Sequence, residues 1–147
     1  MIAVIQRVKN AKVTVNKDVA GEINAGFLVY LGIMDADDEN DLEKIVEKLI
    51  TMRIIADEDS KMNKSIVETK GEILLIPQFT LCADTQGLRP SFSKAKNPKE
   101  AKVMFENCVK MLISKGIKTE KGVFGAYMQV TSVNDGPITF IINSDKI

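Results

Sequence analysis

The sequence predicts an α+β fold, in which residues 1–147 form a single domain with a curved or barrel-like, mixed or antiparallel sheet and two main helices packed outside it. Seven segments show the alternating or β-branched residues of strands, and only two stretches show the 3.6-residue apolar repeat of a helix. The first four strand-like segments precede any helix, which disfavours a regular alternation of strands and helices. A chain of 147 residues is also long enough for one hydrophobic core.

The N-terminal part of the chain is predicted to contain four strands. They cover residues 3–8, 11–16, 19–23 and 26–33, and "NKDVAGEI" is interpreted as a hairpin return between the second and the third. Three further strands are predicted in the rest of the chain. They are "EILLIPQFTL" at 72–81, "AYMQVTSV" at 126–133 and "ITFII" at 138–142.

The first helix is predicted over residues 40–52. Asn40 and Glu43 have the spacing of a capping box, and the following apolar residues recur on one helical face. The acidic run "DADDENDLE" overlaps its start, but it lacks the Gly and Glu that a calcium loop needs at its sixth and twelfth positions. We therefore interpret the run as a solvated, negatively charged helix start, which suits the helix dipole.

The second helix is predicted over residues 97–116. Asn97 is the expected cap, Pro98 the first helical residue and Gly116 the stop signal. Its inner stripe contains Phe105 and Cys108, so this cysteine is interpreted as a core residue.

The composition excludes several kinds of chemistry. The chain has no histidine, which removes Ser-His and Cys-His nucleophilic pairs. Two distant cysteines, Cys82 and Cys108, cannot complete a zinc site, so we expect no metal and no cofactor. The formal net charge is zero, so any contact with nucleic acid must come from a local patch.

The start of the chain and its apolar runs indicate where the protein works. "MIAVIQRV" lacks the long apolar region of a secretory signal, and "GFLVYLGIM" is too short to cross a bilayer. Two unclustered cysteines fit a reducing compartment. We therefore expect a cytoplasmic protein with no membrane partner.

The segment "PQFTL" is a candidate site for binding an oxyanion. Pro77 ends a strand, and the backbone N–H groups of residues leaving a strand end often have no partner. Gln78, Phe79 and Thr80 follow it, and Thr80 is also a candidate nucleophile. A threonine needs an activating base, and no spacing supplies one, so we favour a positioning role for Thr80. A bulged strand edge remains the structural alternative.

The segment "NDGPIT" is unusual between two predicted strands. Pro137 cannot donate a ladder hydrogen bond, and Gly136 weakens a strand interior. A third candidate is the basic stretch from Arg89 to Lys102, which includes Lys94 and Lys96. This stretch is either a solvated loop and helix face or a patch that contacts phosphates.

"PQFTL" and "NDGPIT" together resemble the two signature motifs of the D-aminoacyl-tRNA deacylases. The usual forms of these motifs are Ser-Gln-Phe-Thr-Leu and Asn-x-Gly-Pro-x-Thr. The resemblance extends over essentially the whole chain, through "MIAVIQRV", "GEINAGFLVYLGI", "KMNKSI", "RPSFSKA" and "FGAYMQVTSVNDGPITF". Two motifs in order, at this chain length and with these flanks, are a specific signal.

The resemblance implies a function. These enzymes hydrolyse the ester between a D-amino acid, or glycine, and the terminal adenosine of tRNA, and they spare L-aminoacyl-tRNA. They are homodimers in which a cis Gly-Pro corner enters the active site of the other subunit. Gly136 and Pro137 would hold the substrate ammonium, and Arg7 would hold the corner in place. An exposed Arg7 at a strand edge is the alternative.

The implied chemistry uses main-chain groups. Amides near Phe79 and Thr80 would bind the oxyanion, Gln78 would orient the loop or contact the adenosine, and Phe79 would lie under the ribose or base. The ribose 2′-hydroxyl of the tRNA would help to activate water. Arg89, Lys94 and Lys96 are the expected tRNA contacts.

Two departures from the family pattern leave alternatives open. Pro77 replaces the usual serine, as in related deacylases of relaxed chirality that act on L-alanyl-tRNA, so such an enzyme is the first alternative. The loop "DTQGLRP" is one residue shorter than usual before Arg89. A non-catalytic RNA-binding module and a protein that dimerises through its sheet are the remaining alternatives.

Overall fold

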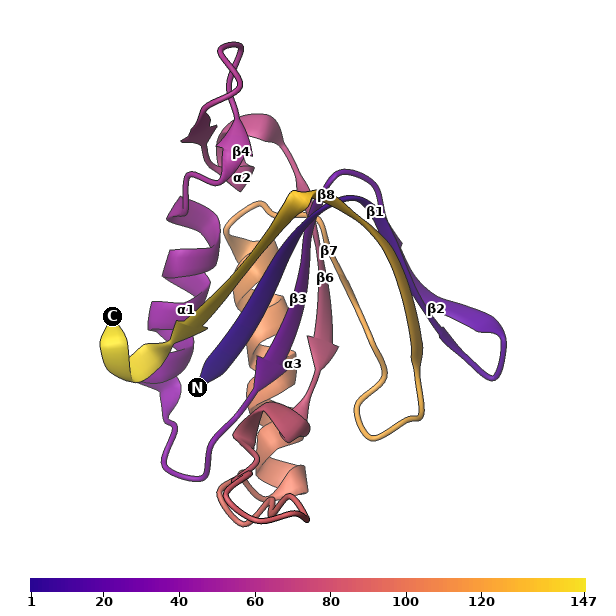
Figure 1. The fold of residues 1–147 in the computed structure, drawn as a ribbon, viewed down its shortest axis with the longest axis vertical. Helices are drawn as coiled ribbons and strands as arrows, with labels where there is room; N and C mark the ends of the chain where they lie inside the picture. Colours follow the sequence, from indigo (N-terminus) through magenta and orange to yellow (C-terminus); the bar gives the residue numbers. More distant parts are fainter.

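The computed structural model describes residues 1–147, which fold around one large sheet (Figure 1). The elements follow the chain as β1 (Ile2–Val15), β2 (Asp18–Ile23), β3 (Gly26–Gly32), α1 (Glu39–Thr51), β4 (Ile55–Ala56), β5 (Met62–Lys64), α2 (Ile66–Thr69), β6 (Glu72–Pro77), the 3₁₀ turn η1 (Phe79–Cys82), α3 (Pro98–Ser114), β7 (Thr119–Lys121), β8 (Gln129–Asn143) and the 3₁₀ turn η2 (Ser144–Lys146).

The large sheet is mixed and nearly closed, as the sequence predicted. Its strand order is β2-β1-β3-β6-β7, and β8 pairs with the other edge of β1. β3, β6 and β7 are parallel, whereas β1 is antiparallel to β2, β3 and β8. The ends of this order approach each other, since a Cβ atom on Gly21 of β2 would lie 2.9 Å from the carbonyl oxygen of Lys121 in β7. The sheet therefore curves into a barrel-like shape.

The seven predicted strands correspond to five strands of the structure, because two pairs of them are continuous. Residues 3–8 and 11–16 belong to one strand, β1, because β8 pairs with it along both halves. Likewise, 126–133 and 138–142 contribute to one strand, β8, which continues through Gly136 and Pro137. β6 ends at Pro77, so the predicted strand 72–81 was too long. The short elements β4, β5, α2 and β7 have too few residues for a visible period, and they were not predicted.

The two long helices were predicted correctly apart from one cap. Asn97 caps α3, Pro98 is its first residue, and Gly116 follows its end with φ +83°. α1 starts earlier than predicted. Its cap is Asp38, whose carboxylate accepts from the amides of Asn40 and Asp41, while the Asp41 side chain accepts from the Asp38 amide.

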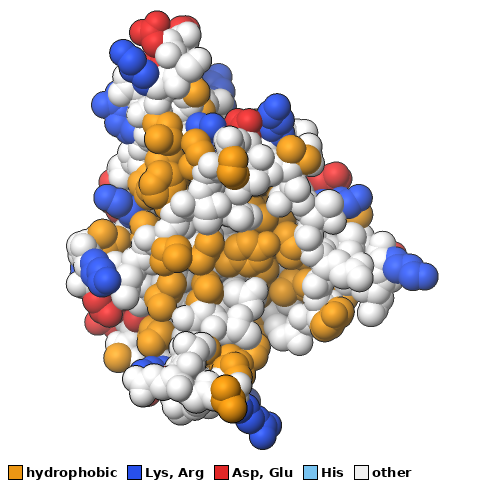
Figure 2. Space-filling model, viewed as in Figure 1, with side chains coloured by type: hydrophobic (Ala, Val, Ile, Leu, Met, Phe, Trp, Pro, Cys, Tyr) orange, Lys and Arg blue, Asp and Glu red, His pale blue; other side chains and the backbone are white.

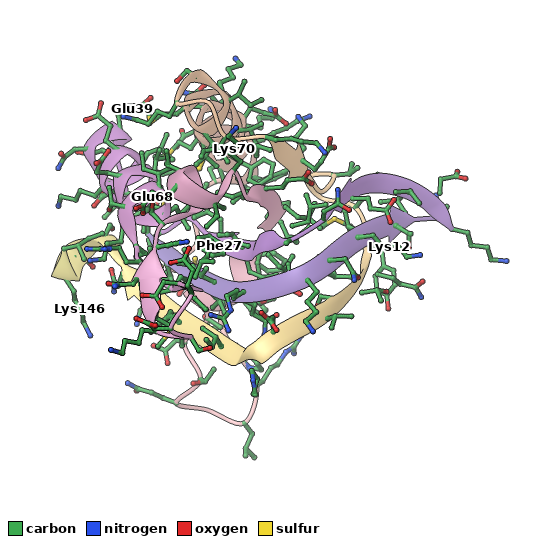
Figure 3. The ribbon with its side chains drawn as sticks, turned by 90° about the horizontal axis from the view of Figure 1, so that it is seen from above. Lys12, Phe27, Glu39, Glu68, Lys70 and Lys146 are labelled. Atoms are coloured by element: carbon green, nitrogen blue, oxygen red, sulfur yellow. The ribbon has the colours of Figure 1, made fainter.

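The sheet separates two apolar clusters. Alternate residues of β3 serve both, with Phe27 in the larger cluster under the helices and Leu28 in the smaller cluster inside the curved sheet. The view from above shows Phe27 in the interior and β8 running alongside β1 with a bend midway along its length (Figure 3). None of the helices is long and apolar enough to span a membrane.

The amino terminus is fixed inside the fold. The ammonium group of Met1 donates to Asp37 Oδ1 at 2.5 Å and to Ser144 Oγ at 2.7 Å, and all three residues are buried. The interpretation of the acidic run as fully solvated was therefore wrong at Asp37. Sequence reasoning missed this because the partner lies 36 residues away along the chain.

Candidate active site

A cavity of about 420 Å³ opens where β3 and β6 end against the start of α3. Its lining is mainly apolar. Leu31, Ile33 and Phe105 contribute core side chains, and Phe79 and Phe92 contribute exposed ones. Pro77 and Gln78 also line it, so three residues of the "PQFTL" segment face one cavity. Thr80 is exposed and lies outside this lining.

The η1 turn presents two free backbone donors. The Gln78 amide donates to the Leu31 carbonyl at 2.8 Å, which fixes the end of β6 to β3. The chain then turns, and the amides of Phe79 and Thr80 donate no hydrogen bond within the protein, because the first N–H groups of a helical turn have no partner before them. Both residues are exposed. Two such N–H groups side by side can bind a developing oxyanion.

The side chain of Gln78 organises the same turn. Its amide nitrogen donates to the hydroxyl oxygen of Thr80. The hydroxyl proton of Thr80 is left free to point elsewhere. The structure thereby brings Gln78 and Thr80 together.

The cavity contains one ionisable side chain. Lys96 is part of the lining, but its Nζ donates to the carbonyl oxygen of Asp35 at 2.7 Å. No carboxylate or thiol lines the cavity, and no histidine exists in the chain. Thr80 thus has no evident general base, and the cavity offers chiefly N–H dipoles and apolar walls.

The aromatic rim was missed by the sequence analysis. Phe92 meets Phe79 edge to face with ring centroids 5.0 Å apart, and Phe124 lies 6.1 Å from Phe105. Phe92 lies within "RPSFSKA", a segment that the sequence analysis used for its charges and for the family resemblance, without assigning a role to the phenylalanine. An aromatic residue in a predicted loop was the available signal, but its partner is set by the tertiary fold.

The second motif forms a corner within the β1–β8 ladder. Gln6 pairs with Thr139 and Val8 with Asn134, so the four residues 135–138 of β8 face Arg7 alone. We call residues 135–138 the corner. The peptide bond between Gly136 and Pro137 is cis, and both residues are exposed. The corner is therefore an enlarged bulge of the kind that aims residues away from a sheet.

Arg7 holds the base of this corner. Its Nε donates to the Asp135 carbonyl at 3.0 Å, and its Nη1 donates to the Ile54 carbonyl at 2.9 Å. The side chain is only 14% exposed, and its Nε also lies 3.5 Å from the Asp135 carboxylate. The alternative of a freely exposed Arg7 is thus not what the structure has.

The corner and the η1 turn lie at opposite ends of the sheet. Gly26, the first residue of β3, pairs with Val8 beside the corner, whereas Gly32, the last, contacts the η1 turn. Six residue steps along a strand span roughly 20 Å. Figure 1 shows this separation, with the bend of β8 at the upper end of the sheet and the turn after β6 below its lower end. One chain does not bring Gly136 and Pro137 to its own Phe79 and Thr80.

The predicted tRNA contacts are divided. Lys96 lines the cavity, and Lys94 makes an ion pair with Asp84 at 3.0 Å close by. Arg89 is exposed in the loop between them and the η1 turn. The basic side chains therefore lie on the side of the molecule where the cavity opens.

Comparisons with known proteins agree along almost the full chain. The model of a family described as D-Tyr-tRNA(Tyr) deacylase matches residues 4–143. A D-aminoacyl-tRNA deacylase of Aquifex aeolicus is 47% identical over 148 residues, covering 100% of both chains. One from Shewanella denitrificans is 48% identical over 141 residues, covering 95% of this chain and 97% of that protein.

Solved structures share the same fold. A protein described as c-Myc DNA Unwinding Element Binding Protein superposes with a TM-score of 0.92 at 37% identity, covering 97% of this chain and 98% of that one. A probable eukaryotic D-amino acid tRNA deacylase superposes with a TM-score of 0.84 over 96% and 97% of the two chains. Its identity is 15%, so it supports the fold alone.

Proposed function

We propose that this chain, which belongs to the D-Tyr-tRNA(Tyr) deacylase family, hydrolyses the ester bond of D-aminoacyl-tRNA and releases a D-amino acid and free tRNA. The chain is accordingly a hydrolase of aminoacyl-tRNA. The observation that carries the proposal is the pair of unpartnered amides at Phe79 and Thr80, placed beside a cavity whose one ionisable side chain, Lys96, already donates to a backbone carbonyl. A tRNA substrate would be met in the cytoplasm, and we propose that the enzyme acts there.

The proposed reaction depends on main-chain groups. The terminal aminoacyl-adenosine would enter the cavity between Phe79 and Phe92, with an aromatic face under the ribose or base. The amides of Phe79 and Thr80 would stabilise the oxyanion as water attacks the ester carbonyl. One such donor contributes roughly a hundredfold or more to the rate. Gln78 would act by fixing the Thr80 hydroxyl.

The attacking water would be activated by the substrate. Lys96 is the one ionisable residue of the lining, and its ammonium group donates to a carbonyl of its own chain. An ammonium ion cannot accept a proton. The 2′-hydroxyl of the terminal ribose is then the group best placed to help, and Thr80 serves to position it.

We assign chiral selection to the corner of a second copy of the chain. Within one chain the corner lies at the far end of β3 from the η1 turn, so selection by Gly136 and Pro137 requires a partner. Exposed Tyr127, Val133 and Ile141 lie on or next to β8. Figure 2 shows apolar side chains gathered across the middle of this face, with charged ones around it. Such a patch marks an interface, and a homodimer would bury it.

The partner's corner would both bind and exclude. The carbonyls of Gly136 and Pro137 would accept hydrogen bonds from the substrate ammonium and occupy the space that an L side chain needs. A D side chain points away, and glycine has none, so glycyl-tRNA would also be hydrolysed. Steric exclusion of the L side chain can discriminate between enantiomers where attractive contacts alone cannot.

The presence of Pro77 indicates a second candidate function. It lines the cavity where the family usually has serine, and it removes one N–H donor and a hydroxyl. A deacylase of relaxed chirality acting on L-alanyl-tRNA is therefore the runner-up. Arg89, Lys94 and Lys96 remain the proposed tRNA contacts in either case.

The test is release of amino acid from D-aminoacyl-, L-aminoacyl- and glycyl-tRNA. We expect rapid release from the D and glycyl substrates and none above the spontaneous rate from the L substrate. Release from L-alanyl-tRNA would favour the runner-up. No release from any substrate, with tRNA still bound, would leave an RNA-binding module.

The cross-subunit corner is tested by complementation. A Cβ at Gly136 would lie 2.6 Å from a side-chain atom of Ile138, so Gly136→Ala disturbs the corner. Ala101 lines the cavity, and Ala101→Phe fills it. Each variant alone should be inactive. Mixed dimers keep one site with an intact cavity and an intact corner, so refolded mixtures should recover about a quarter of the activity. No recovery, with mixed dimers demonstrated, would show that the corner acts within its own chain.

A further inference from the structure

Two side chains close the corner from either end. Asn134 precedes it, and its Oδ1 accepts a hydrogen bond from the Ile138 amide at 2.8 Å. The Nδ2 of the same side chain donates to Thr139 Oγ1 at 3.1 Å. A single amide side chain thus binds the last backbone donor of the corner and the first residue after it.

The neighbouring strand secures this arrangement. Gln6 of β1 pairs with Thr139, and its Nε2 donates to Thr139 Oγ1 at 3.3 Å. Thr139 Oγ1 therefore accepts from two amide groups, which uses both of its lone pairs. On the opposite side, Arg7 donates to the Asp135 carbonyl. The first and last residues of the corner are held from different directions.

The two residues between these anchors make no side-chain hydrogen bond of their own. Gly136 has no side chain, and Pro137 has no N–H. Both are exposed. The position of their carbonyls is consequently set by the anchors at Asp135 and Ile138.

Asn134 and Thr139 have little to do with the stability of the core. Thr139 is exposed and Asn134 is half-buried, and neither belongs to an apolar cluster. Hydrogen bonds of this kind contribute modestly to folding because water replaces them on unfolding. A wall that rejects an enantiomer by steric conflict must nevertheless stay in place, since a shift of about 1 Å changes rates by large factors.

We propose that Asn134 is a positioning residue for chiral selection, which acts with Thr139 to fix the carbonyls of Gly136 and Pro137. The inference rests on the proposed deacylase function. It predicts that loss of the hydrogen bonds made by Asn134 and Thr139 lets L-aminoacyl-tRNA enter while the protein remains folded.

The experiment compares matched variants of the full-length protein with D- and L-tyrosyl-tRNA. Asn134→Leu and Thr139→Val remove these hydrogen bonds while keeping a side chain of similar volume. Asn134→Asp keeps the acceptor for Ile138, and the Thr139 hydroxyl can rotate to donate to its second oxygen. Thr131→Val is the control, because Thr131 is an exposed residue of the same strand with no side-chain hydrogen bond.

We expect the ratio of D to L release rates to fall at least about tenfold in Asn134→Leu and Thr139→Val. Asn134→Asp and Thr131→Val should keep the wild-type ratio. Amide hydrogen exchange at Ile138 should accelerate in Asn134→Leu, with the exchange of core strands unchanged. A preserved ratio in Asn134→Leu, or unaltered exchange at Ile138, would overturn the inference. Equal release of both enantiomers by the wild-type enzyme would instead overturn chiral selection itself.

Discussion

Burial controls the chemistry of the cysteine side chains. Cys108 lies on the buried face of α3, and desolvation raises its pKa to about 12. Cys82, at the end of the η1 turn, is also buried, and its pKa is raised for the same reason and by the nearby charge of Asp37. Neither thiol is a nucleophile for the reaction, since the thiolate is the reactive form.

We therefore predict that Cys108 does not react with a disulfide reagent at about pH 8 in the folded protein and reacts fully in denaturant. Its folded-state pKa exceeds the unfolded value, so between roughly pH 9 and 12 the unfolded state loses its proton first and stability falls as the pH rises. Thiol titration with and without urea checks the first claim. Cys108→Ser should not be used as a control, because it buries a hydroxyl.

At the residue scale, sequence reasoning found the residues whose backbone chemistry is unusual for a strand. Pro77 and the Gly136–Pro137 pair were visible because Pro and Gly are out of place in strands. Phe92, Phe105 and Phe124 were missed as cavity residues because their chemistry is ordinary and their convergence is tertiary. Asp37 was missed for the same reason, as its partner is the chain's own ammonium group.

At the scale of elements, β3 and η1 are fitted closely together. A Cβ on Gly32 would lie 2.8 Å from Leu81 Cβ and 3.1 Å from the Gln78 carbonyl oxygen. The first of these distances is shorter than real Cβ contacts, so one of the two elements must move. The turn that carries the free amides is the less anchored of the two.

Gly32→Ala should thus displace η1 and lower the release rate by about tenfold or more, with destabilisation of about 1–3 kcal/mol from overpacking. Gly87→Ala is the matched control, because the nearest atom to its Cβ would be 3.8 Å away. Release assays and urea unfolding measure the two effects. Wild-type turnover in a folded Gly32→Ala protein would show that the η1 amides are not critical.

The start of α1 shows why element boundaries resist prediction. Asp38 with Asp41, and Asn40 with Glu43, both fit the capping-box spacing, and the sequence does not rank them. The structure uses the earlier pair. The preceding Asp37 must turn inward to reach Met1, which places the helix start directly after it.

At the scale of the whole molecule, the class of fold could be predicted and the pairing could not. The order of strand-like and helical segments predicted the α+β class with a curved, mixed or antiparallel sheet. The parallel pairing of β3 with β6 and β7 depends on contacts between distant segments, which alternation does not encode. The corner was predicted as a break between strands, whereas β1 continues opposite it and keeps β8 as one element.

A substitution on the exposed face of β8 tests the proposed dimer. Ile141 is 73% exposed in the single chain, so Ile141→Lys should leave the fold intact while disfavouring burial of this face. We predict a shift toward monomer in sedimentation and a loss of turnover. Ile113→Lys, at a 54% exposed position of α3, should change neither. A monomeric Ile141→Lys protein with full activity would separate catalysis from association.

The double anchoring of β8 also restricts how this enzyme can change over evolution. The pairing of β1 with β8 stops at Val8 and Asn134 on one side of the corner and starts again at Gln6 and Thr139 on the other side. One inserted or deleted residue between Asn134 and Thr139 would either turn every later side chain of β8 to the opposite face or pull the Gly-Pro dipeptide off its position. Gaps between relatives should accordingly fall in surface loops such as the stretch before Arg89, and the six-residue motif should have a single permitted length.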